Sequence, residues 1–193
     1  DDGESAPEGI GLELHAGLPV ISATRIDLTA GDRIAEPALS SFSPLSLSYS
    51  TIFDGQAEAA TDFHLDADRF VRVEVAAGRC GNLRRGVIVR RLLEIETYRS
   101  MALLGLPLAR DLGGRVADYE HRLTQIVRTI GLSQSAAEHQ ETLAGLHALS
   151  SEVGRTVEET SFRFAATQAY ADLLDNRLGR LREAAIGEFT TIE

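Results

Sequence analysis

The segment TDFHLDAD contains the side chains best suited to bind a metal ion. Asp62, His64 and Asp66 occupy alternate positions, so on a β-strand their side chains would point to one face. An imidazole with carboxylates is a reasonable ligand set for zinc or manganese, and it would support a metal-dependent enzyme. The alternative is the solvent face of a hairpin with an Asx turn at Asp66 and Asp68, because polar residues alternate on any half-exposed strand. We favour this alternative.

A second group of polar side chains interrupts the apolar segment RRLLEIETYRSMALLGLPLAR. A catalytic carboxylate pair would require Glu94 and Glu96 to converge, but two positions apart on a helix they diverge by about 200°. Each carboxylate instead has an arginine three or four residues away, which is the spacing of ion pairs within a helix. The spacing therefore predicts a structural ion-pair network rather than an active site, formed by Arg90, Arg91, Glu94, Glu96, Tyr98 and Arg99.

The composition excludes several classes of function. The chain has 193 residues and a formal net charge of −10, and its basic residues are not concentrated in one place, which argues against binding to nucleic acid. All 19 basic residues are arginine, so a Schiff-base lysine and a P-loop lysine are excluded. Cys80 is the only cysteine, which excludes an internal disulfide and a Cys-x-x-Cys metal site. We predict no cofactor and no catalytic residue.

The first part of the chain has the pattern of a small sheet. Alternating apolar residues and turn signals predict strands at 12–16, 20–28, 47–53, 57–65 and 69–75. A short helix is expected within 30–42, and Asp54-Gly55 predicts a tight turn. We therefore expect residues 1–78 to form a mostly β domain with an antiparallel sheet.

The second part of the chain has helical periodicity. Apolar residues predict helices at about 83–106, where Pro107 stops or kinks the helix, and at 114–130. A third, proline-free segment at about 135–187 repeats apolar residues in steps of three and four, which is typical of a coiled coil. The expected fold class is therefore α+β, in which residues 79–193 form a helical domain with long antiparallel or coiled-coil helices.

The long ordered string at Arg90–Arg110 also carries a resemblance to a known family. Together with ATDFHLDADRFVRVEV, SFRFAATQAYADLLDNRLGRLRE and GEF, it resembles the uncharacterised bacterial membrane-anchored proteins of domain-of-unknown-function family 3422. The resemblance implies a membrane anchor beyond this chain and a location on the cytoplasmic side of the bacterial inner membrane. Family members often have arginine after TDF, where this chain has His64, and this difference weakens the metal hypothesis.

Three functions are compatible with these features. We favour a non-enzymatic cytoplasmic domain of a membrane-anchored protein that forms a homo-oligomer through its long helices, for assembly, scaffolding or regulation at the membrane. The first alternative is the cytosolic regulatory domain of an ion channel or transporter similar in layout to CorA, with a divalent cation held between subunits by Asp62, Asp66 and Asp68. The second alternative is a metal-dependent enzyme that uses the face of Asp62, His64 and Asp66.

Overall fold

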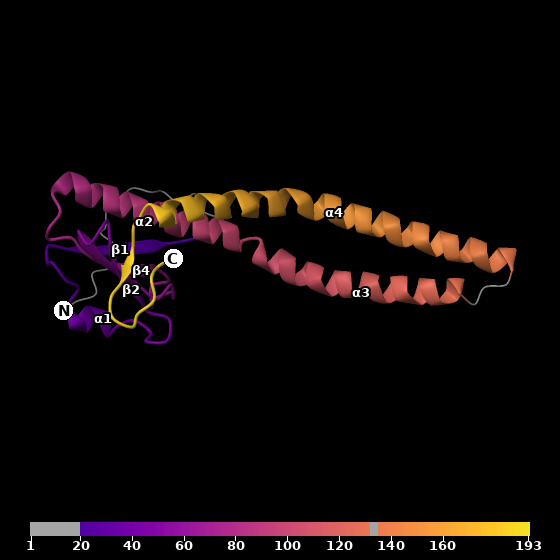
Figure 1. Ribbon diagram of the computed structural model, residues 1–193, viewed down its shortest axis with the longest axis horizontal. Coiled ribbons are helices and arrows are strands. Elements are labelled where there is room, and N and C mark those ends of the chain that lie inside the picture. Colours follow the sequence, from indigo (N-terminus) through magenta and orange to yellow (C-terminus); the bar gives the residue numbers. More distant parts are fainter. Residues whose placement is uncertain (1–19, 132–134) are drawn as a thin grey trace.

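The computed structural model describes residues 20–131 and 135–193. A small sheet domain lies at one end, and two long helices extend from it as a hairpin (Figure 1). The predicted α+β class is confirmed, since a mostly antiparallel five-stranded sheet is combined with long helices. The strand predicted at 12–16 lies outside the described residues.

The sheet has the strand order β1-β4-β3-β2-β5. Its antiparallel pairs are β4–β3, β3–β2 and β2–β5, whereas β1 pairs with β4 in parallel. The predicted Asp54-Gly55 turn joins β2 to β3, and both residues have positive φ there. The bounds of the strands are β1 Thr24–Thr29, β2 Ser48–Ile52, β3 Ala57–Thr61, β4 Val71–Ala76 and β5 Ala184–Ala185.

The first long helix, α2 (Asn82–Leu103), packs its buried residues against the sheet in the main hydrophobic core. Its residues Ile88, Leu92 and Ile95 recur at helical spacing and are all buried. They pack in one cluster with strand residues such as Val73 and Val75. A smaller cluster includes Phe42, Tyr49 and Ala60, with Ala38 and Leu39 of α1 (Glu36–Leu39) packed against it.

Two helix boundaries differ from the sequence predictions. The short helix expected within 30–42 is limited to the four residues of α1, and Pro37 lies in its first turn, where a missing N–H costs little. For the same reason Pro107 begins a helix instead of only ending one. Helix α3 (Leu106–Ile130) therefore starts eight residues before the predicted 114.

The C-terminal boundary of the longest helix was also wrong. Helix α4 (Ala136–Gly179) begins at a capping box formed by Ser135 and Glu138 and ends eight residues before the predicted 187. Leu181, which fits the helical repeat, is instead fully buried in the core beside the sheet, and its carbonyl accepts a 2.6 Å hydrogen bond from the Phe53 amide. Tertiary burial thus overrides the repeat. The division of the chain at residues 78 and 79 stays a prediction, although β5 belongs to the sheet.

The corner between α2 and α3 lies close against α4. Gly105 follows α2, and a Cβ atom there would overlap the side chain of Thr167 on α4. Glycine at this corner therefore permits the close approach of the two helices. Among the described residues, no helix combines the length and apolarity that a bilayer crossing requires.

The C-terminal segment contains a half-buried carboxylate with a testable effect on stability. Glu183 Oε2 accepts hydrogen bonds from Ser50 Oγ at 3.1 Å and Ile192 N at 2.8 Å. Oε1 is buried and has no hydrogen-bond partner among the described residues. Burial raises the pKa of Glu183 above the ordinary value of 4.5, although the two hydrogen bonds oppose that rise.

We predict that Glu183→Gln flattens the pH profile of stability. Because its pKa is higher in the folded state, the native protein binds this proton more tightly, and stability falls as pH rises from about 4.5 through the folded pKa. The neutral amide cannot ionise, so the variant should lack this contribution to the dependence of stability on pH. Urea unfolding between pH 4 and 8 measures this, with Glu188→Gln as a control for the lost charge. An unchanged slope for Glu183→Gln would contradict the prediction.

Candidate functional site

The charged residues of α2 divide into two groups that face different parts of the molecule. Glu94 lies 3.9 Å from Arg90 Nε and 3.7 Å from Arg91 Nη1, at the spacings that the sequence predicts for ion pairs. Arg177 of α4 adds a third cation, with its Nε 2.7 Å from Glu94 Oε2. This contact is a charge pair without hydrogen-bond alignment, because Arg177 Nε makes no hydrogen bond to a described residue. Glu94 therefore links α2 to α4.

Tyr98 belongs to the same contact between α2 and α4. Its ring stacks on Tyr170 with centroids 6.3 Å apart, and the guanidinium carbon of Arg177 lies 5.8 Å from its centroid. Both partners come from α4, more than 70 residues away in the sequence. Spacing along α2 identifies Tyr98 as part of the network, but it provides no signal for Tyr170 or Arg177.

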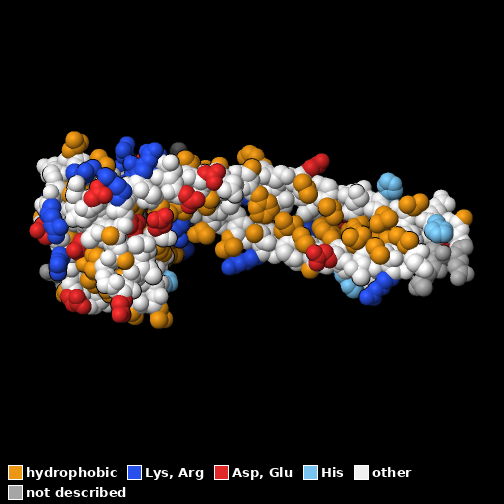
Figure 2. Space-filling model, in the orientation of Figure 1, with side chains coloured by type: hydrophobic (Ala, Val, Ile, Leu, Met, Phe, Trp, Pro, Cys, Tyr) orange, Lys and Arg blue, Asp and Glu red, His pale blue; other side chains and the backbone are white. Residues whose placement is uncertain are grey.

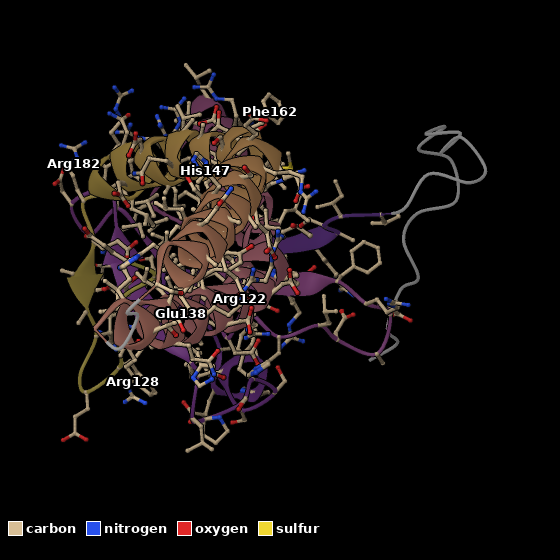
Figure 3. All side chains as sticks on the ribbon, turned by 90° about the vertical axis from the view of Figure 1, so that its right-hand side faces the viewer. Arg122, Arg128, Glu138, His147, Phe162 and Arg182 are labelled. Atoms are coloured by element: carbon tan, nitrogen blue, oxygen red, sulfur yellow. The ribbon has the colours of Figure 1, made fainter. Side chains whose placement is uncertain are left out.

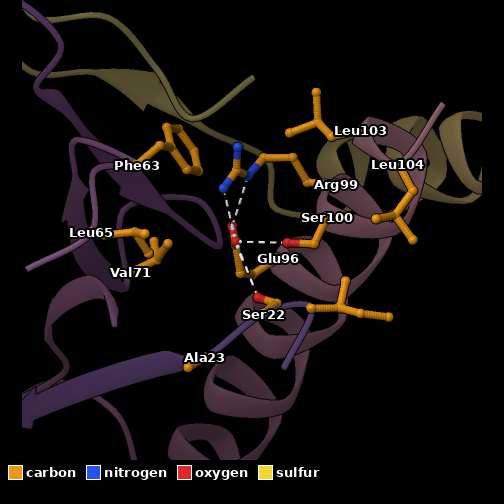
Figure 4. A pocket seen from close by; sticks show the side chains of 11 residues that line it. Ser22, Ala23, Phe63, Leu65, Val71, Glu96, Arg99, Ser100, Leu103 and Leu104 are labelled. Carbon is orange, nitrogen blue, oxygen red and sulfur yellow. Dashed lines mark hydrogen bonds and ion pairs between the residues drawn. The ribbon is translucent and has the colours of Figure 1, made fainter. Parts of the chain in front are cut away.

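Glu96 faces the opposite side, toward the sheet. It is only 3% exposed and accepts two hydrogen bonds of 2.8 Å from Arg99 Nε and Nη2. Ser100 Oγ donates to Glu96 Oε1 at 3.0 Å, and Ser22 Oγ, from the segment before β1, lies 3.5 Å from the same oxygen (Figure 4). Because Glu94 and Glu96 face different surroundings, they do not form a catalytic carboxylate pair.

A pocket of about 280 Å³ opens beside this buried ion pair. Glu96 and Arg99 form its polar end, together with Ser22 and Ser100. Its apolar lining comes from the segment before β1, the loop after β3, the start of β4 and the end of α2, with Ile21, Phe63, Leu65, Val71, Leu103 and Leu104 (Figure 4). The site combines an apolar wall with one neutralised cation, which suits binding rather than acid–base catalysis.

Phe63 shapes this pocket through an unusual backbone conformation. Its φ is 57°, in the left-handed region that an aromatic residue rarely adopts. The conformation directs the ring toward Arg99, whose guanidinium carbon lies 4.7 Å from the ring centroid. The contact is a cation–π interaction. Strained residues of this kind are frequent at ligand-binding sites.

The residues of the candidate metal site lie in the irregular segment around Phe63. Strand β3 ends at Thr61, so Asp62, His64 and Asp66 do not alternate along a regular strand as predicted. Asp62 Oδ2 accepts the Ser43 amide at 2.9 Å, and Oδ1 accepts the amide of His64 at 3.0 Å. The carboxylate of Asp62 therefore stabilises the backbone of two loops.

The side chains of His64 and Asp66 also contact groups of the surrounding loops. His64 Nδ1 lies 3.1 Å from Ser46 Oγ and 3.6 Å from Asp62 Oδ2. Asp66 Oδ1 accepts the amides of Asp68 at 3.0 Å and Phe70 at 2.8 Å, which is an Asx-type turn. Within the described ranges, no three His, Cys, Asp or Glu side chains are placed to hold a metal ion.

The contact between the helices of the α3–α4 hairpin includes several polar side chains. The buried residues of α4 are three threonines and one leucine, and each threonine hydroxyl donates to a backbone carbonyl one turn earlier. Tyr119 Oη lies 2.8 Å from Thr156 Oγ1, and Arg122 Nη1 donates to Glu152 at 2.8 Å. These pairs show that the two helices run antiparallel.

Most of the large apolar side chains of the hairpin lie outside this contact. None of the 25 residues of α3 is buried. On α3, Val116 and Leu123 directly follow Arg115 and Arg122, which contact α4. On α4, Val153 and Val157 directly follow Glu152 and Thr156, which contact α3. Each successive residue is rotated by about 100° around the helix axis. Because the two helices are antiparallel, these rotations bring the four side chains to the same face of the hairpin.

We call this face the hairpin stripe. It consists of the exposed residues Val116, Leu123, Val127 and Ile130 of α3, and Leu143, Val153 and Val157 of α4. Figure 2 shows apolar side chains gathered in a band along the hairpin. Phe162, also exposed, lies on the side of α4 away from α3 (Figure 3) and is not part of the stripe.

A family model described as "Protein of unknown function (DUF3422)" matches residues 9–193. Neither a curated protein nor a solved structure matches the chain significantly.

Proposed function

The chain belongs to the DUF3422 family of proteins of unknown function, and on this premise we propose that it is a non-enzymatic module that associates with copies of itself through the α3–α4 hairpin. The observation that carries the proposal is the hairpin stripe, on a helix of 25 residues with no buried side chain. A helix that is amphipathic but unpartnered on its apolar face is typical of an interaction surface.

The size of the stripe supports a second copy as the partner. Its seven side chains expose roughly 600 Å² of apolar surface. Two stripes that covered each other completely would remove about 1,200 Å² from water, which is the lower end of the range of specific protein interfaces. Two antiparallel hairpins packed face to face would form a four-helix bundle, in which the heptad-spaced residues of both hairpins become the core.

The cellular setting is a further part of this proposal. The family resemblance at Arg90–Arg110 supports a protein anchored to the bacterial inner membrane, with this chain on the cytoplasmic side. Assembly, scaffolding or regulation at that membrane would use the hairpin stripe as the contact between copies. The carboxylates of Asp62 and Asp66, which both the ion-channel and the metal-enzyme alternatives require, accept hydrogen bonds from backbone amides, and neither alternative gains support from this geometry.

Substitutions in the stripe test the self-association. Val127 is 57% exposed and Leu123 is also exposed, so glutamate at either position should leave the fold intact and place a charge inside the proposed interface. We expect each of Leu123→Glu and Val127→Glu to raise the dissociation constant of the dimer at least 100-fold. Sedimentation equilibrium with multi-angle light scattering over a range of concentrations measures this.

The matched control is Phe162→Glu, which adds the same charge at an 83% exposed position on α4 outside the stripe. It should associate as the wild type does. A wild-type chain that stays monomeric at about 100 µM, or a control that dissociates as readily as Val127→Glu, would contradict the proposed interface.

A further inference from the structure

The pocket beside Glu96 contains one strong hydrogen-bond donor that has no partner among the residues the structure describes. Arg99 uses Nε and Nη2 to bind Glu96. Its remaining nitrogen, Nη1, carries two N–H groups and makes no hydrogen bond to any described residue. Figure 4 shows the guanidinium between the ring of Phe63 and the carboxylate of Glu96. A planar guanidinium fixed on two sides is a preorganised site for an anionic oxygen.

The surroundings of Arg99 limit the charge of a ligand. Glu96 already neutralises the guanidinium, and its carboxylate lies within hydrogen-bond distance of the same group. Glu96 repels each negative charge that a ligand brings, so a ligand with two such charges is disfavoured more than a ligand with one, while a cation would be repelled by the guanidinium itself. A single negative charge, spread over two oxygens, fits this balance better than a phosphate dianion.

The rest of the pocket limits the body of the ligand. The walls away from Arg99 are apolar, and Leu65, Leu103 and Leu104 are exposed at its rim. An apolar chain on these leucines would cover surface that water now contacts. The volume of about 280 Å³ accommodates about six to ten carbon atoms.

We propose that this pocket binds a small amphipathic monocarboxylate, whose carboxylate accepts hydrogen bonds from Arg99 Nη1 and whose short apolar chain lies against Leu65, Leu103 and Leu104. The left-handed backbone of Phe63 holds the aromatic ring against Arg99 and so orients the guanidinium before the ligand arrives. The proposal is independent of self-association, because none of these residues belongs to the hairpin stripe.

Calorimetric titration of the intact chain with sodium octanoate tests the proposal. We expect saturable binding with a dissociation constant of about 0.1–1 mM, together with a change in the NMR signal of the Arg99 Nε–H group. 1-Octanol lacks the charge and octyl phosphate carries a second one, so both should bind at least tenfold more weakly. No saturation by about 10 mM octanoate, or equally tight binding of either analogue, would overturn the assignment.

Two matched variants locate the site without disturbing the buried ion pair. Leu65→Glu places a negative charge at an exposed position of the rim and should weaken octanoate binding at least tenfold. Leu83→Glu adds the same charge in the first turn of α2, at a position that is 87% exposed and outside the pocket, and should leave binding unchanged. Equal affinities for the two variants would show that octanoate binds elsewhere and would refute this site.

Discussion

Glu96→Ala is expected to lower the free energy of unfolding by about 3 kcal/mol, because it leaves the guanidinium of Arg99 beside an apolar pocket without its counter-charge. The substitution removes two hydrogen bonds from Arg99 and one from Ser100, all within 3.0 Å of the carboxylate. Glu96 is almost completely buried, so water replaces these bonds only in part. Arg99 is partly exposed and recovers some hydration, which sets the loss at the lower end of values for buried ion pairs.

The matched control is Glu159→Ala on α4. Glu159 also pairs with arginines, at 3.6 Å from Arg115 and 3.8 Å from Arg155, but its side chain is about half exposed. Its removal should cost no more than about 0.5 kcal/mol. Urea unfolding at one fixed protein concentration compares the two variants, since self-association makes apparent stability depend on concentration. A loss below about 0.5 kcal/mol for Glu96→Ala would show that the buried pair does not stabilise the fold.

A double substitution separates the charge from the shape of this site. Glu96→Leu combined with Arg99→Leu removes both ions and leaves apolar side chains, which is often close to neutral for stability. We expect the double variant to recover most of the stability that Glu96→Ala loses, while octanoate binding is lost with the guanidinium. If the double variant is as unstable as Glu96→Ala, the shape of the site rather than charge balance determines its stability.

Gly78→Ala should destabilise the sheet domain by about 2–4 kcal/mol, because the new methyl group has no room. A Cβ at this position would lie 2.5 Å from the carbonyl oxygen of Ala30, 2.5 Å from Asp32 Oδ1 and 2.9 Å from the carbonyl carbon of Gly31. The Asp32 side chain can rotate away, but the two backbone atoms move only with the loop after β1. That loop also accepts the 2.8 Å hydrogen bond of the Gly78 amide at Gly31.

Gly86→Ala is the control for the change of residue type. Gly86 lies inside α2, and apart from its chain neighbours and the adjacent helix backbone no described heavy atom lies within 4 Å of the Cβ it would gain. Alanine should therefore stabilise the helix by about 0.5–1 kcal/mol. Thermal unfolding of the two variants should shift in opposite directions, and equal shifts would contradict the steric explanation for Gly78.

The segment from Asp62 to Asp66 departs from the strand that its alternation predicted, whereas the favoured interpretation, an Asx turn at Asp66, is confirmed. Alternation predicted that Asp62, His64 and Asp66 share one face of a strand, and this requires an extended backbone throughout. The left-handed φ of Phe63 breaks that alternation after β3. No local signal identifies this conformation, because phenylalanine disfavours it in isolation and only contacts such as that with Arg99 offset its cost.

The pairs within α2 could be predicted from spacing alone. Arg90 and Arg91 lie near Glu94, and Arg99 binds Glu96, because helix geometry places residues three and four apart on one face. The same geometry predicted that the two carboxylates diverge. The surroundings of the two carboxylates depend on elements far away in the chain. Glu94 contacts Arg177 of α4, and Glu96 lies beside the pocket.

The sequence by itself determined the local features of this protein: the α+β class, the helical spacing of the second half, and the charge pairs along α2. Those features depend on interactions within a few residues, which a pattern of residue types records directly. Three features depend on the tertiary structure alone. Leu181 is buried in the core instead of continuing α4, the ring of Phe63 contacts Arg99 beside the pocket, and the hairpin exposes an apolar face to solvent. The reason is that burial and charge balance depend on contacts between segments that are distant in the sequence. Where these contacts compete with local conformational preference, the contacts prevail.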